Sequence, residues 1–145
     1  MKKFDGLNCI LLVDDDDATN FINQRLIKKT GIDTHVQVAM NGLEAVEYLS
    51  QKGLFEDKGK FPQPGLVFLD INMPGMNGWE FLEVYKTLPA DKQNQIIVAM
   101  LTTSLNPDDE TRAKKFKDYL REFINKPLTL EKLNGLVEKY YIALS

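Results

Sequence analysis

Five short apolar runs alternate with longer amphipathic stretches along this chain, and that order limits its possible folds more than any other feature. The apolar runs cover residues 7–14, 34–40, 65–71, 95–102 and 119–125. Runs of this length, bounded by turn residues, are typical of buried strands. The third and fourth runs are almost entirely apolar, which is expected of strands covered on both faces.

Each run is followed by a stretch with the spacing of an amphipathic helix. These stretches cover residues 18–31, 41–53, 77–89, 106–118 and 129–144. Gly31 and Pro89 are typical stop signals, while Asn77 and Asn106 are typical N-caps. The chain therefore reads as strand–helix units repeated five times.

Apolar stripes show which side of two of these helices should face the core. In the stretch 41–53 the stripe is Leu43, Val46 and Leu49. In the stretch 129–144 it is Leu133, Leu136, Val137, Tyr140 and Leu144. The stretch 106–118 offers only Ala113 and Phe116 as clear apolar contacts. Its thin packing favours either a segment that shifts easily or an ordinary surface helix.

Repeated strand–helix units predict an α/β fold, in which a doubly wound parallel sheet carries helices on both faces. A chain of 145 residues suits one domain of this kind. Ligands of such folds bind at the carboxyl ends of the strands, where the winding reverses. The residues that end each strand are therefore the first place to look for chemistry.

Reactive side chains stand at the ends of four of the five predicted strands. They are Asp14, Asp15, Asp70, Thr102 and Lys126. Carboxylates, a backbone carbonyl and waters are the ligands that Mg²⁺ prefers, and the ion would relieve the repulsion among the acids. By itself the run Asp14–Asp17 also fits a solvated acidic loop, and Asp16 and Asp17 either belong to such a loop or cap the next helix.

Composition excludes several classes of protein. The net charge is −3, from 18 basic and 21 acidic residues, so no basic surface for nucleic acid is expected. The single cysteine, Cys9, excludes an intrachain disulfide and a cysteine-rich zinc site. The apolar run near the start is too short for a signal peptide or a membrane span, so we expect a cytoplasmic protein.

Four segments together resemble the receiver domain of bacterial two-component response regulators. They are LLVDDD, VFLDINMPGMNG, MLTTS and NKP, and they fall in this order at the ends of successive strands. The resemblance covers roughly residues 7–144 and is closest to the stand-alone, chemotaxis-regulator type. It implies a flavodoxin-like (βα)5 fold with strand order 2-1-3-4-5, as one domain over residues 1–145 with no output domain.

The resemblance also implies roles for the acidic residues. Asp70 matches the aspartate that accepts a phosphoryl group. Asp14 and Asp15 match the acidic pair that holds Mg²⁺ together with Asp70, with Asp15 as the more direct ligand. Asn72 stands where the family offers a backbone carbonyl to the metal.

Three further residues match the positions that respond to the phosphoryl group. Thr102 matches the switch hydroxyl, Lys126 the conserved-type lysine and Phe123 the switch aromatic residue. By the same resemblance, the peptide bond between Lys126 and Pro127 is a candidate for the cis form.

The function implied is that of a switch rather than an enzyme with a separate substrate. A phosphohistidine on a sensor histidine kinase, or on a histidine phosphotransfer protein, would phosphorylate Asp70 in a Mg²⁺-dependent reaction. The signal would pass to a protein target through the face formed by 106–118, 119–125 and 129–144. No nucleic acid or membrane is expected as a partner.

Other functions remain possible from the sequence alone. A Mg²⁺-dependent phosphohydrolase with an aspartate nucleophile needs a second carboxylate two residues later, where this chain has Asn72. A flavin binder would have to place its phosphate near three acids, and a degenerate receiver would only dock. The chain also departs from the family in a long segment, 51–65, and in lacking a glycine before the last strand.

Overall fold

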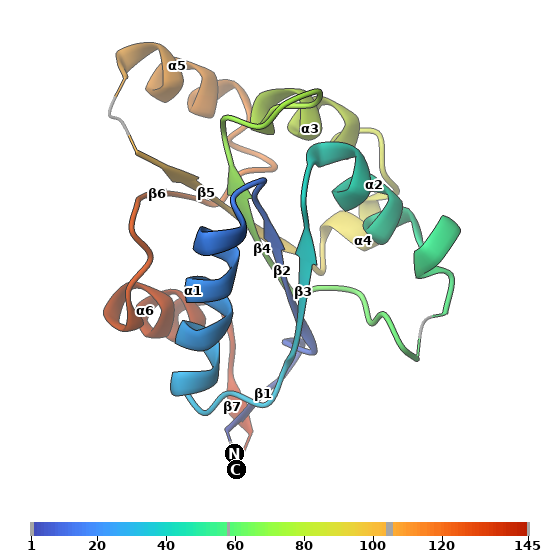
Figure 1. The fold of residues 1–145 in the computed structure, drawn as a ribbon, viewed down its shortest axis with the longest axis vertical. Coiled ribbons are helices and arrows are strands. Elements are labelled where there is room, and N and C mark those ends of the chain that lie inside the picture. Colours follow the sequence, from blue (N-terminus) through green and yellow to red (C-terminus); the bar gives the residue numbers. More distant parts are fainter. Residues whose placement is uncertain (1, 58, 104–105, 145) are drawn as a thin grey trace.

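A five-stranded parallel sheet forms the centre of the molecule in the computed structural model, which describes residues 2–57, 59–103 and 106–144 (Figure 1). Its strands are β2 (Cys9–Val13), β3 (His35–Ala39), β4 (Leu66–Asp70), β5 (Ile97–Thr102) and β6 (Glu122–Asn125). They lie in the order β3-β2-β4-β5-β6, and every neighbouring pair is parallel. Counted along the chain this order is 2-1-3-4-5, so the predicted flavodoxin-like fold is confirmed.

Helices cover both faces of the sheet. The five main helices are α1 (Asp17–Lys29), α2 (Gly42–Ser50), α3 (Gly78–Tyr85), α5 (Pro107–Lys115) and α6 (Leu130–Tyr140). A short helix α4 (Ala90–Gln93) and a 3₁₀ turn η1 (Gly53–Phe55) were not predicted. Asn77 and Asn106 cap α3 and α5 as predicted, and Asn77 does so in a reciprocal capping box with Glu80.

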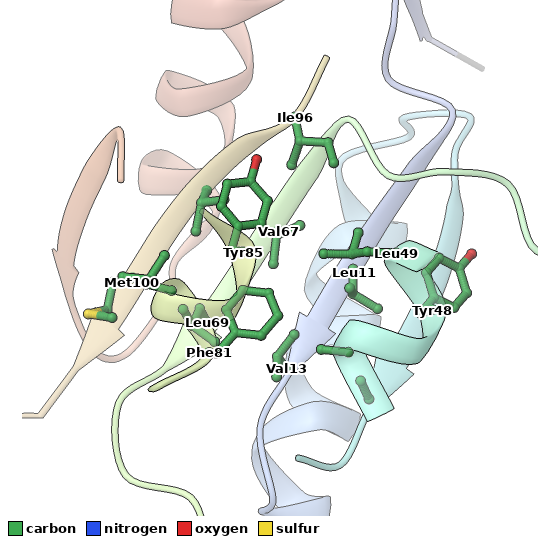
Figure 2. Packing of buried hydrophobic residues seen from close by; sticks show 14 of the residues in the cluster. Leu11, Val13, Tyr48, Leu49, Val67, Leu69, Phe81, Tyr85, Ile96 and Met100 are labelled. Carbon is green, nitrogen blue, oxygen red and sulfur yellow. The ribbon is translucent and has the colours of Figure 1, made fainter. Parts of the chain in front are cut away.

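Alternate residues of the strands divide the core into two clusters. One face of the sheet packs against α2 and α3, and Figure 2 shows part of this cluster from close by. They include Leu11, Val13, Val67, Leu69 and Met100 from the strands and Tyr48, Leu49, Phe81 and Tyr85 from the helices. The other face packs against α1 and α6 through Ile10, Leu12, Leu66, Phe68, Ile27, Leu133 and Val137. Burial on both faces explains why β4 is apolar throughout, apart from its last residue.

The end of the chain differs from the prediction. Helix α6 stops at Tyr140, and β7 (Ala143–Leu144) pairs antiparallel with β1 (Lys3–Phe4), which brings the two ends of the described chain together (Figure 1). Leu144 is therefore 54% exposed instead of completing an apolar stripe on the helix. Strand β6 begins three residues later than predicted, at Glu122.

The stripe predicted for α2 was also partly wrong, because Leu43 is exposed. The buried face of this helix is formed by Ala45, Tyr48 and Leu49. Leu43 precedes Ala45 by two residues, which is about 200° around the helix axis, so it points away from the core. Among the described helices, none has the length and apolar character that a membrane span requires.

The long segment 51–65 is fixed to α2 by aromatic packing. Helix α2 ends earlier than predicted, at Ser50, and Gln51 follows in a left-handed conformation. The rings of Tyr48, Phe55 and Phe61 then pack edge to face. The Tyr48 hydroxyl donates a hydrogen bond to the Pro62 carbonyl at 2.7 Å. Lys58 of this segment lies outside the described residues.

Gly65 and Gly135 provide a matched test of how tightly the backbone packs at Gly65. At Gly65 an added Cβ would overlap the backbone carbonyl of Gly6, whereas at Gly135, within α6, it would meet no atom within 4 Å. We expect Gly65→Ala to destabilise the fold by roughly 2 kcal/mol. Gly135→Ala should stabilise it by about 0.5–1 kcal/mol, since alanine favours a helix more than glycine does. Urea unfolding measures both, and an unchanged midpoint for Gly65→Ala would contradict the close approach.

Candidate functional site

The carboxyl ends of four neighbouring strands bring the predicted site residues together. Asp14 follows β2, Asp70 ends β4, Thr102 ends β5 and Lys126 follows β6. Because all these strands are parallel, their carboxyl ends share one edge of the sheet. Asp14, Asp70 and Thr102 are each at most 9% exposed, so they form the floor of the site rather than its rim.

Three carboxylates converge at this edge. Asp14, Asp15 and Asp70 each offer an oxygen, and these oxygens lie within 4.8 Å of one another. Oxygen ligands around one Mg²⁺, at about 2.1 Å from the ion, lie roughly 3–4 Å apart. The cluster therefore fits a single small divalent cation after small side-chain adjustments.

Lys126 joins two of these acids. Its Nζ donates hydrogen bonds to Asp14 Oδ2 at 3.1 Å and to Asp70 Oδ1 at 2.9 Å. Burial opposes the charge on this amine, but the two hydrogen bonds outweigh it and hold the pKa of Lys126 above its usual value. The Lys126–Pro127 peptide bond is cis, as the resemblance implied.

Burial dominates the electrostatics of Asp70. It raises the pKa of the Asp70 carboxyl above its usual range, and the negative charges of Asp14 and Asp15 add to this effect. The hydrogen bond from Lys126 lowers the pKa but does not cancel the rise. The protein groups alone thus disfavour a negative charge on Asp70, and a divalent cation would reverse the balance.

The four consecutive acids divide between the site and the next helix. Asp16 caps α1, because its Oδ1 accepts the Ala18 N–H at 3.2 Å and its Oδ2 accepts the Thr19 hydroxyl at 2.6 Å. The Thr19 hydrogen bond lowers the pKa of Asp16. Asp17 lies in the first turn, where the helix dipole favours an acid. The N-cap alternative therefore holds for Asp16, while Asp17 belongs to α1 itself and the buried Asp14 is not part of a solvated loop.

The turn after β4 folds back onto the strand that ends in Asp70. The Gly78 N–H donates to the Ile71 carbonyl at 2.8 Å, and a Cβ at Gly78 would stand 2.6 Å from the Asp70 carbonyl oxygen. Only glycine permits this approach without a shift of the backbone. Asn72 lies exposed in this turn, and its backbone carbonyl as a metal ligand stays a prediction.

An aromatic set connects α3 to the segment after α5 and to β6. The ring of Trp79 stacks on Phe123 with centroids 6.4 Å apart and on Phe116 with centroids 5.9 Å apart. Phe123 is half-buried, and Trp79 and Phe116 are each 6% exposed. The contacts of Trp79 with these rings could not be predicted, because Phe116 and Phe123 lie far along the chain. Its place directly after Gly78, at the start of a helix, was the one local signal.

Comparison with known proteins agrees with this geometry. The model of the response regulator receiver domain family matches residues 10–138. The chain belongs to this family. Receiver domains are phosphoacceptor switches of two-component signalling. Response regulators receive phosphate from histidine kinases. Receiver domains also generally bind a divalent metal.

Several relatives of this receiver domain are similar over most of its length. The response regulator Rcp1 of Synechocystis sp. is 38% identical over 100 residues, which are 69% of this chain and 65% of Rcp1. The crystal structure of a two-component response regulator from Cytophaga hutchinsonii has 34% identity and a TM-score of 0.77, covering 92% of this chain and 96% of that one. The crystal structure of the Mn²⁺-bound form of Rcp1 has 32% identity and a TM-score of 0.72, covering 92% of this chain and 93% of that one.

Proposed function

We propose that this receiver domain accepts a phosphoryl group on Asp70, in a Mg²⁺-dependent reaction, from a phosphohistidine of a sensor histidine kinase or a histidine phosphotransfer protein. The observation that carries the proposal is the convergence of Asp14, Asp15 and Asp70 beside the ammonium of Lys126. The similarity to the Mn²⁺-bound form of Rcp1 supports a divalent metal as the ligand of this chain.

The metal would be held by the carboxylates of Asp14, Asp15 and Asp70 and by the backbone carbonyl of Asn72. When bound, it supplies positive charge that offsets the repulsion between the aspartate nucleophile and the incoming phosphoryl group. Mg²⁺ suits this donor set, because it prefers oxygen ligands in an octahedral arrangement and keeps several waters.

The chain's own residues then carry the transfer. A carboxylate oxygen of Asp70 attacks the phosphorus, and the bond between phosphorus and the histidine nitrogen breaks with its electron pair left on the imidazole. Lys126, already 2.9 Å from Asp70, is placed to hold a phosphoryl oxygen. The Thr102 hydroxyl would donate a hydrogen bond to another. Attack by water on the resulting acyl phosphate resets the switch.

The readout would use the aromatic set and α5. None of residues 107–115 in α5 is buried, so moving this helix disrupts little packing. Phe116, just beyond its end, contacts Trp79, which also contacts the switch residue Phe123. The resemblance implies that Thr102 moves toward the phosphoryl group and that Phe123 turns inward behind it. Through the rings of Trp79 and Phe116 such a turn would reach α5. We place the downstream protein target on the face formed by α5, β6 and α6.

Intact-protein mass spectrometry tests the proposal. Incubation with acetyl phosphate and Mg²⁺ should add the mass of one phosphoryl group, and chelation of the metal with EDTA should prevent it. No added mass under either condition would overturn the proposal. Sustained release of phosphate from a phosphate ester would instead favour a phosphohydrolase, although Asn72 offers no general acid.

A further inference from the structure

Asn20 is a buried amide that contacts the backbone of the acidic pair. It lies in the first turns of α1 and is 4% exposed. Its Nδ2 donates a hydrogen bond to the Asp14 carbonyl oxygen at 2.8 Å and lies 3.6 Å from Met40 Sδ. The side chain thus reaches from the helix to the backbone of Asp14, directly after β2.

The Asp14 carbonyl belongs to the peptide unit that leads into Asp15. This unit is planar, so fixing its oxygen also fixes the nitrogen and the Cα of Asp15. On its other side Asp14 is held by its own N–H, which donates to the Ala39 carbonyl at 3.1 Å. Because the Asp15 side chain is exposed, the direction of its carboxylate depends on this backbone rather than on surrounding packing.

Asn20 contributes little to folding by itself. Its Oδ1 is buried without a hydrogen-bond partner among the described residues. Leaving a buried acceptor unpaired costs at least as much as one neutral hydrogen bond contributes. An apolar residue of similar shape would remove this unpaired acceptor but would leave the Asp14 carbonyl without its Asn20 donor. The gain and the loss roughly cancel, so the net effect of the amide lies in the geometry of the acidic pair.

We infer that Asn20 is a positioning residue for the divalent metal, acting through the Asp14–Asp15 peptide. The inference rests on the metal site proposed above. Ligands of a small ion must be held within about 0.5 Å of the productive geometry, and groups that orient ligands typically change metal affinity by 10–100-fold. Asn20 should thus act on metal affinity more than on stability.

The test compares the metal affinity and the thermal stability of matched variants. Asn20→Leu keeps the branched shape of the side chain, with bulkier methyl groups, and removes the donor. Asn20→Ser serves if the leucine variant does not fold, since its hydroxyl is too short to reach Asp14. Calorimetric titration with Mg²⁺ and with Mn²⁺ should show roughly tenfold weaker binding for either variant. The melting temperature without metal should change little.

Thr30→Val is the control at the opposite end of α1. Thr30 is 6% exposed, and its hydroxyl donates to the Ile27 carbonyl and accepts from the Ile32 N–H. Its loss should lower the melting temperature and leave metal affinity unchanged. Equal affinity of the Asn20 variants and the wild type would overturn this inference and leave the proposed function standing. A wild-type protein that binds neither ion would overturn both.

Discussion

Replacing Asp70 with asparagine should abolish phosphoryl uptake and leave the fold intact. The amide has nearly the shape of the carboxylate but lacks the charge and the nucleophilic oxygen that the transfer needs. We expect the rate of mass gain with acetyl phosphate and Mg²⁺ to fall by roughly 10³-fold or more.

The same substitution should raise stability without metal at neutral pH. Burial raises the pKa of Asp70 in the folded protein above its ordinary value. A carboxylate of this kind opposes folding at every pH above its folded pKa, and this effect fades as the pH falls through that pKa. The melting temperature of Asp70→Asn in EDTA should therefore exceed that of the wild type, which separates loss of function from loss of fold.

Asp91→Asn is the matched control for this prediction. Asp91 is exposed on α4, and its replacement should change neither phosphoryl uptake nor the melting temperature. If Asp70→Asn still gains the mass of a phosphoryl group, the acceptor is another residue, and peptide mapping would identify it. A melting temperature below that of the wild type would contradict the electrostatic description of the site.

The site could be predicted largely from sequence because its residues stand at the ends of recognisable strands. Asp14, Asp70 and Lys126 are far apart in the chain, but the alternation of strands and helices places all three at one edge of the sheet. Their identity then suggests a metal, whereas the phosphoryl group was implied only by the resemblance to receiver domains. Local capping chemistry offered both Asp16 and Asp17 as N-cap candidates, and the structure gives that role to Asp16.

Features without periodicity or local chemistry could not be predicted. The pairing of β1 with β7 involves two residues on each strand, which is too short to show alternation. The contact of Trp79 with Phe123 and the hydrogen bond from Asn20 to Asp14 depend on how helices rest on the sheet. The sequence shows which residues these are, but it does not show how the helices that carry them pack on the sheet.

Replacing Lys126 with methionine should separate the effect of its charge on stability from its effect on phosphoryl transfer. Methionine keeps a long apolar side chain and removes the ammonium, so Asp14 and Asp70 lose the cation that joins them. Breaking a buried ion pair costs up to about 5 kcal/mol. Because Lys126 is partly exposed, we expect this variant to lose about 2 kcal/mol of stability without metal. Mg²⁺ should restore more stability in this variant than in the wild type, because the ion replaces the lost charge.

Phosphoryl transfer by Lys126→Met should not recover in the same way. The ammonium is placed to contact a phosphoryl oxygen, and loss of one such contact typically slows a reaction by about 10²-fold or more. The rate of mass gain at saturating Mg²⁺ and the melting temperatures with and without Mg²⁺ measure the two effects separately. Lys132→Met is the control, since the Lys132 amine donates to the Asn125 and Pro127 carbonyls rather than to the acids. A normal rate together with lowered stability in Lys126→Met would mean that Lys126 only offsets the charges of Asp14 and Asp70. The metal and Thr102 alone would then stabilise the phosphoryl group.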